Sequence, residues 1–178
     1  MNIRNRYFFQ DQRMDYFKSF SKAWCLDYLL LSEQYFLRRY LSALRAEEYY
    51  TFESPNKLMR LFYLRRKNLL GRKLGFFISA GCFEEDLKIY HYGSIIVHPK
   101  AKIGKHCTIH GNCCIGTKGG NSEGYPVIGD HVDIGQGAQI LGGITIANNV
   151  RIGAGAIVTK SILEEGVTVV GIPARILQ

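Results

Sequence analysis

One feature constrains the fold of this chain more than any other: in its second half an aliphatic residue returns every six positions. A helix repeats about every 3.6 residues and a strand about every two, so neither yields a period of six. A coil of three short strands per turn does, with one hexad on each face. The sequence therefore predicts a mainly β protein, a left-handed parallel β-helix, with these aliphatic residues pointing inward: Val97, Ile103, Ile109, Ile115, Ile128, Ile134, Ile140, Ile146, Ile152 and Val158.

Small residues accompany the aliphatic ones. Glycine often follows them directly, as in Gly104, Gly129 and Gly153, and glycine allows a tight corner. The period breaks once, between Ile115 and Ile128, where about seven residues are extruded. The glycines, asparagine and proline of this segment predict a projecting loop over 117–127. Loops on a rigid scaffold commonly carry function.

The first half follows the helical period instead. Ser32 is a predicted N-cap for an amphipathic helix running toward Tyr50. A second helix is expected with Ser54 as N-cap, Pro55 in its first turn and Gly71 at its end. A further helix is expected around Asp15 to Leu31. The predicted organisation is thus a helical region 1–80, a β-helix 81–163 and a C-terminal tail 164–178.

The net charge of +8 is unevenly placed, with +6 in residues 1–93 and +2 in residues 94–178. The densest basic stretch runs from Arg60 to Lys73. A solvated helix face explains it most simply, while steering of a polyanionic ligand and peripheral contact with an anionic membrane remain open. No recognisable nucleic-acid-binding module accompanies the charge, so we expect no nucleic-acid partner.

The rest of the composition indicates an ordinary soluble protein. No stretch approaches the length that spans a bilayer, and the N-terminus lacks an apolar signal core, so we expect a cytoplasmic location. The five cysteines are odd in number and form no CxxC pair, which favours free thiols. Cys107 and Cys113 occupy inward positions of the period while nearby histidines do not, so we expect no metal site.

Two segments resemble a known family. The stretch "VIGDHVDIGQGAQILGGITIANNVRIGAGAIVTKS", followed by "VVGIPARIL", resembles the C-terminal part of hexapeptide-repeat acyltransferases. The segment "LKIYHYGSIIVHPKAKIGKHCTIHGNCCIG" is similar to the serine acetyltransferase branch, which includes polysaccharide O-acetyltransferases. The resemblance implies transfer of acetyl from acetyl-CoA to a hydroxyl, without a metal or a covalent intermediate. It also implies a homotrimer with active sites between neighbours, or a dimer of such trimers.

The resemblance assigns the chemistry to particular residues. Its general base is the histidine of an "HxG" element, which here is His91 of His91-Tyr92-Gly93. A neutral imidazole can take the proton of the attacking hydroxyl. The matching CoA-binding positions are Gly135, Gly153 and Ala154, with Lys160 and Arg175 placed to meet the phosphates. A glycine at a prism corner is the alternative explanation for the small residues. Extended backwards, the period places His91 inward, so its role depends on the resemblance.

Two departures from the family bear on the acceptor. Serine acetyltransferases carry an aspartate directly before the base and a histidine before the loop proline; here these positions are Tyr90 and Tyr125. Tyrosines suit sugar rings, so we expect a saccharide acceptor, from a surface polysaccharide or its precursor, contacted by Tyr90, Tyr92, Tyr125 and His110. Two alternatives for His110 are a second general base and a surface histidine without a catalytic role. The alternatives are a serine O-acetyltransferase of cysteine biosynthesis and a non-catalytic β-helix scaffold.

Overall fold

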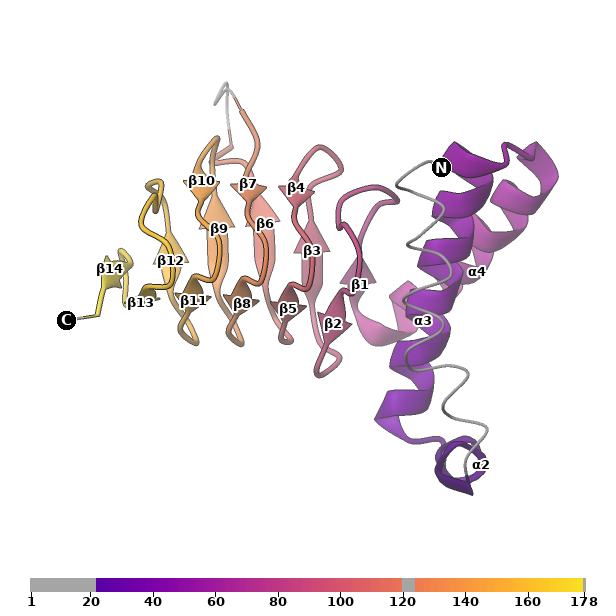
Figure 1. The fold of residues 1–178 in the computed structure, drawn as a ribbon. Coiled ribbons are helices and arrows are strands. Elements are labelled where there is room, and N and C mark those ends of the chain that lie inside the picture. The colour runs from indigo at the N-terminus through magenta and orange to yellow at the C-terminus, as the bar shows by residue number, and fades with distance from the viewer. Residues whose placement is uncertain (1–21, 120–123, 178) are drawn as a thin grey trace. The chain divides into compact units, whose positions relative to one another are not determined.

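The structure is a computed structural model of the 178-residue chain. It describes residues 22–119 and 124–177, with the side chains of 22–25 left aside. The chain divides into two compact units, Met1–Phe76 and Phe77–Gln178. The first is helical and the second is a coil of short strands (Figure 1). Within the described residues, no helix combines the length and the apolar character needed to cross a membrane.

The helical unit contains α2 (Lys22–Leu29), α3 (Glu33–Glu48), the π-helical turn η1 (Tyr49–Glu53) and α4 (Lys57–Leu74). Ser32 caps α3 as predicted, because its Oγ accepts a hydrogen bond from the Tyr35 N–H at 3.4 Å. The buried face of α3, with Leu37, Tyr40 and Leu44, packs along α4. The first predicted helix is seen only as α2, since its earlier part lies outside the described residues.

The ends of α4 differ from the prediction. Asn56, not Ser54, is the N-cap, because its Oδ1 accepts from the Met59 N–H at 3.0 Å. Gly71 lies inside the helix, which ends instead at Gly75 in the left-handed conformation, with φ of 82°. A Cβ on Gly71 would lie 2.6 Å from the carbonyl oxygen of Phe76. The glycine therefore serves close packing rather than helix termination.

The β unit is built from short strands on three faces. Sheet A has the order β1-β3-β6-β9-β12, sheet B the order β10-β7-β4, and sheet C the order β14-β13-β11-β8-β5-β2. The described pairings from β2 to β13 are parallel, and β14 is antiparallel to β13. The strands are β1 (Phe76–Phe77), β2 (Lys88–Ile89), β3 (Ile95–Val97), β4 (Lys102–Ile103), β5 (Thr108–Ile109), β6 (Cys114–Gly116), β7 (Val127–Ile128), β8 (Asp133–Ile134), β9 (Gln139–Leu141), β10 (Thr145–Ile146), β11 (Arg151–Ile152), β12 (Ile157–Val158), β13 (Thr168–Val170) and β14 (Arg175–Ile176).

The period of six correctly identifies the core of this unit. All ten inward residues named above are buried, none more than 3% exposed. In the regular coils Ile128 pairs with Ile146, 18 positions further along the chain. Across the break, Ile103 pairs with Ile128 at a separation of 25. The seven extra residues lie between β6 and β7, in a segment of which the structure describes 117–119 and 124–126.

The first coil carries a second, smaller irregularity. Ile89 pairs with Ile109, a separation of 20, while Ile96 pairs with Cys114, a separation of 18. Two extra residues therefore lie between β2 and β3, in the segment that holds His91. Ile89 and Ile95 fill the interior there, and the His91 side chain is exposed. The prediction that His91 points inward is therefore wrong. Counted backwards from Val97, the period is interrupted between β3 and β2, so the inward residue is Ile89 and not His91.

Residues 164–178, expected as a tail, contribute two strands. β13 pairs in parallel with β11, and Val169 is buried at 1% exposure. β14 then pairs with β13 in the antiparallel sense. The inward packing of sheet C therefore continues past the last hexad.

Candidate functional site

Four residues stack at one edge of the prism, between sheets C and A. The N–H of Tyr90 donates to Ile109, that of His110 to Ile134, that of Gly135 to Ile152 and that of Gly153 to Val169, at 2.8–3.2 Å. Tyr90, His110, Gly135 and Gly153 therefore hold the same position in successive coils. We call this edge the Tyr90 corner. It brings together the predicted base segment and three of the other predicted site residues.

The His91-Tyr92-Gly93 element is held against the next coil by its backbone. The Ser94 N–H donates to Asn112 Oδ1 at 3.0 Å, and a Cβ on Gly111 would lie 2.9 Å from the Tyr92 carbonyl oxygen. Gly93 has φ of 137°, which favours glycine. His91 is exposed at the corner, with Tyr90 on one side, 50% exposed, and Tyr92 on the other, 53% exposed. An exposed imidazole on a fixed backbone can reach a bound hydroxyl.

Tyr90 and His110 form a stacked pair with a carboxylate behind it. The two ring centroids are 4.7 Å apart and the planes differ by 13°. The Nε2 of His110 lies 3.4 Å from Oδ1 of Asp133; this oxygen is withdrawn from solvent, although the Asp133 side chain as a whole is 49% exposed. Asp133 was not among the predicted site residues. Pairing the coils would have shown it, because Thr108 and Asp133 are register neighbours on sheet C.

Tyr125 lies at a different edge of the prism, between sheets A and B. Its ring stacks on His98 with centroids 4.6 Å apart and planes at 24°. The ammonium of Lys100 lies 5.0 Å from the ring centroid. The structure therefore does not bring Tyr125 to the Tyr90 corner within one chain. Its half-buried ring is covered by these neighbours and is not an open platform for a sugar.

Gly135 packs directly on the coil that contains Gly153 and Ala154. A Cβ on Gly135 would lie 2.6 Å from the Ile152 carbonyl oxygen and 2.8 Å from the Ala154 nitrogen. This close approach is the corner packing that the sequence left open as an alternative. The same glycines leave a strip of the Tyr90 corner without side chains, with Ala154 exposed beside it.

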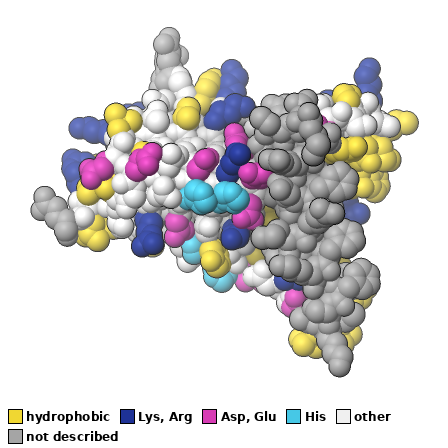
Figure 2. All heavy atoms as spheres, viewed as in Figure 1, with side chains coloured by type: hydrophobic (Ala, Val, Ile, Leu, Met, Phe, Trp, Pro, Cys, Tyr) yellow, Lys and Arg dark blue, Asp and Glu magenta, His cyan; other side chains and the backbone are white. Residues whose placement is uncertain are grey.

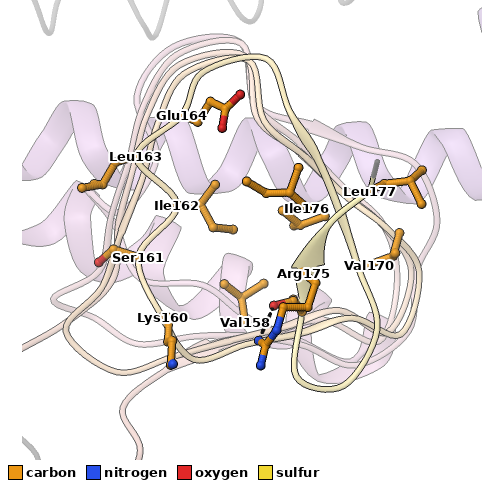
Figure 3. A pocket seen from close by; sticks show the side chains of 12 residues that line it. Val158, Lys160, Ser161, Ile162, Leu163, Glu164, Val170, Arg175, Ile176 and Leu177 are labelled. Atoms are coloured by element: carbon orange, nitrogen blue, oxygen red, sulfur yellow. Dashed lines mark hydrogen bonds between the residues drawn. The ribbon is translucent and has the colours of Figure 1, made fainter.

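Lys160 and Arg175 share a pocket of about 820 Å³ at the end of the β unit (Figure 3). Figure 3 shows both cations beside Val158, with Ile162, Ile176 and Val170 around the apolar part of the wall. Nη1 of Arg175 donates to the Ala174 carbonyl at 3.0 Å, so the guanidinium keeps further donors. The pocket thus combines apolar walls with two cations and one carboxylate, Glu164, and the cations could bind the phosphates of a ligand that also has an apolar part.

The cysteine and histidine positions give no convergent ligand set. Among residues 22–119 and 124–177, no group of three His, Cys, Asp or Glu side chains is placed to hold a metal ion. The Cys107 and Cys113 thiols donate to the carbonyls of Gly129 and Gly135, each at 3.2 Å. Burial raises the pKa of the Cys107 thiol to about 11 and also raises the pKa of the Cys113 thiol.

His106 and His131 stack on each other at another edge of the prism. Their ring centroids are 4.8 Å apart, and Nδ1 of His106 lies 3.0 Å from Oδ2 of Asp86. All three residues have positive φ, between 54° and 57°. This stack lies away from the Tyr90 corner and belongs to the scaffold.

Comparison with known proteins relates the β unit to one family. Residues 125–160 match the model described as bacterial transferase hexapeptide (six repeats). A serine acetyltransferase of Synechococcus elongatus is 37% identical over 90 residues, which cover 50% of this chain and 36% of the relative. One of Staphylococcus aureus is 38% identical over 108 residues, covering 49% of this chain and 50% of the relative. The chain thus spans at most about half the length of these relatives.

Solved structures extend the likeness beyond the repeats. A Neisseria gonorrhoeae serine acetyltransferase in complex with serine aligns with a TM-score of 0.62 and 28% identity, over 76% of this chain and 54% of that one. A soybean serine acetyltransferase aligns with a TM-score of 0.64 and 26% identity, over 77% and 57%. The expected left-handed parallel β-helix with an N-terminal helical region is confirmed.

The expectation of a saccharide acceptor is wrong. The relatives and solved proteins described above are named serine acetyltransferases, and none of them is named a polysaccharide O-acetyltransferase. Two of the tyrosines that suggested a sugar platform are stacked on histidines, Tyr90 on His110 and Tyr125 on His98. The comparisons favour the serine alternative instead.

Proposed function

Because this chain is a hexapeptide-repeat protein of the serine acetyltransferase-like kind, we propose that it is an acetyl-CoA-dependent serine O-acetyltransferase. The observation that carries the proposal is the Tyr90 corner. It holds an exposed His91 in the first coil and two half-buried glycines, Gly135 and Gly153, in the later coils, on one edge of the prism.

The proposed reaction is a direct transfer with His91 as general base. The neutral imidazole takes the proton of the serine hydroxyl as its oxygen attacks the thioester carbonyl. The tetrahedral intermediate then collapses, the carbon–sulfur bond breaks, and the CoA thiolate takes the proton back from the imidazolium. Atoms and charge balance, giving O-acetylserine and CoA, and no covalent enzyme intermediate is needed.

Residues around His91 would contact the acceptor. Tyr90 and Tyr92 border the base on either side, and His110 lies beneath Tyr90 with Asp133 as its carboxylate partner. Tyr125 belongs to another edge of the prism, so it would reach a His91 only from a second copy of the chain. A homotrimer with sites between neighbours supplies such a copy, and we include it in the proposal together with a cytoplasmic location.

Acetyl-CoA would lie along the later coils. Gly135, Gly153 and Ala154 would let its pantetheine arm approach the backbone of the Tyr90 corner closely. Lys160 and Arg175 would hold its phosphates at the pocket near the end of the β unit. Both cations are exposed and so remain accessible to a ligand.

The test is release of CoA thiol from acetyl-CoA in the presence of L-serine. We expect serine-dependent turnover, no comparable rate with glucose, and a loss of about 10²- to 10⁴-fold in His91→Ala. His131→Ala is the matched control, since this exposed histidine lies on another edge, and it should keep full activity. A purified protein that releases no CoA with serine, or a fully active His91→Ala, would contradict the proposal; the second result would also revive a scaffold role.

A further inference from the structure

The whole net charge of the chain belongs to its helical unit. Residues 1–76 contain 15 Lys and Arg against 7 Asp and Glu, a net charge of +8. Residues 77–178 contain 8 of each and are neutral. A basic balance confined to one unit is the footprint of a negatively charged partner for that unit.

Helix α4 concentrates this charge. Its 18 residues include no Asp or Glu and seven basic residues. Lys67 is buried in an ion pair with Glu47 at 2.7 Å, inside the helical unit. The other six are exposed: Lys57, Arg60, Arg65, Arg66, Arg72 and Lys73.

Exposed apolar side chains lie among these cations. Leu58 is 78% exposed, Phe62 52% and Leu69 43%. Spacings of four and seven residues place them in one line along the helix, opposite the buried Lys67 and Gly71. Arg65 and Arg72 belong to the same line, while Arg66 and Lys73 flank it. We call Leu58, Phe62, Leu69 and these four cations the α4 face.

The exposed apolar surface of this helix extends beyond that line. Leu61, on α4 itself, is 62% exposed. On the side shown in Figure 2, hydrophobic side chains gather on the helical region with Lys and Arg close to them. Large apolar residues that remain uncovered in such numbers mark an interaction surface.

The mixture of leucine, phenylalanine and arginine selects among polyanionic partners. At a bilayer surface the apolar side chains enter the acyl boundary, while arginine and lysine extend their heads to the lipid phosphates. A nucleic acid would satisfy the cations but leave the leucines exposed. A second copy of this helical unit also carries a net charge of +8, so the two copies would repel each other. We propose that the α4 face binds the surface of an anionic phospholipid membrane, as a peripheral contact.

This contact is independent of the proposed acetyl transfer. Its residues all lie in Met1–Phe76, and the residues proposed for catalysis all lie in Phe77–Gln178. Failure of one proposal therefore leaves the other standing. Variants of the α4 face are expected to keep CoA release in the absence of lipid.

The test is flotation of the full chain with lipid vesicles. One set contains equal parts of phosphatidylglycerol and phosphatidylcholine, the other phosphatidylcholine alone. We expect binding to the anionic vesicles, weakening as salt is raised, and much weaker binding to the neutral ones. One variant removes the apolar line (Leu58→Ser, Phe62→Ser, Leu69→Ser) and another the charge (Arg65→Gln, Arg66→Gln, Arg72→Gln, Lys73→Gln). Each should lower the affinity by at least about tenfold.

Matched controls come from the β unit. Leu163→Ser removes a leucine that is 74% exposed, and Lys88→Gln with Lys102→Gln removes exposed cations. Both should bind vesicles like the unchanged protein. No flotation of the unchanged protein, or equal flotation of all variants, would overturn the proposal. So would a drop in oligomeric state of the α4-face variants in sedimentation, which would assign the face to a second copy. The charge variant keeps every apolar side chain, so it tests the proposal even if the serine variant folds poorly.

Discussion

The ring of Tyr90 lies face to face with the imidazole of His110 in the next coil, with centroids 4.7 Å apart and planes at 13°. Tyr90 stands where the resembled family carries an aspartate, directly before the proposed base. In this chain a carboxylate lies next to His110 instead: Oδ1 of Asp133, from the following coil, is 3.4 Å from Nε2 of His110. The corner thus ties three coils together through side chains as well as through backbone hydrogen bonds.

The first prediction concerns this stack. Tyr90→Ala and His110→Ala should each destabilise the β unit, and the double variant should lose less than their sum, with a coupling of about 0.5–1.5 kcal/mol. Tyr90→Phe should keep the coupling, since it keeps the ring. Denaturant unfolding of the four proteins measures it. Tyr90→Ala with His131→Ala is the control pair, and its effects should be additive. Additive effects in the Tyr90–His110 cycle would contradict a stabilising interaction between the two rings.

The core could be read from the sequence because its rule is local. One aliphatic side chain per hexad fits inside the prism, so the period alone predicts that residues such as Ile109 and Ile134 are buried. The two extra residues before β3 could not be read this way. They appear only when the separation of paired residues, 20 against 18, is known on two faces. His91 was therefore identified by resemblance and not by periodicity.

Contacts between coils depend on register as well as on period. Asp133 meets His110 across a coil that is lengthened by the seven-residue loop, so the contact is found only when the coils are paired across that loop. In the helical unit Ser54 and Asn56 are both good N-cap residues, and local preference does not choose between them. Gly71 looked like a helix end, but a contact with Tyr40 and Phe76 requires it within the helix.

The second prediction follows from that choice of cap. Asn56→Ala should destabilise the helical unit by about 1 kcal/mol, because the Met59 N–H loses its acceptor. Ser54→Ala should change the stability little. Thermal melts followed by the helical circular dichroism signal compare the two. A larger effect at Ser54 than at Asn56 would mean that α4 begins where the sequence first suggested.

The third prediction separates two glycines that occupy the same hexad position. Gly135→Ala should cost about 1–3 kcal/mol, since its Cβ would meet the Ile152 carbonyl at 2.6 Å. Gly116→Ala should be neutral or stabilise by about 0.4–1 kcal/mol. A Cβ on Gly116 would have the Cys114 Sγ as its nearest atom, at 4.0 Å, so it fits without strain. The substitution also lowers the conformational entropy of the unfolded chain. Denaturant midpoints measure both. Equal losses at the two positions would contradict this account of the corner.

The fourth prediction concerns alkaline pH. Burial raises the pKa of the Cys107 thiol from 9.0 to about 11, so the folded state holds this proton more tightly than the unfolded one. The resulting stability is fully present below pH 9 and is lost as the pH rises from 9 to 11, by up to about 3 kcal/mol. Cys107→Ser removes the titrating thiol and should flatten the decline over that window. An unchanged slope of unfolding free energy against pH would assign the decline to other groups.

The reversed strand β14 has a consequence for assembly. A solenoid of parallel strands exposes unpaired backbone at its last coil, and another copy could continue the sheet there, coil upon coil, into a filament. In sheet C the outermost described strand, Arg175–Ile176, runs against the direction of all the others. The first strand of an added coil would therefore pair antiparallel with Arg175–Ile176 in sheet C, whereas the coils within the chain pair parallel. The reversal thus disfavours continuation of the sheet by another coil of the same kind.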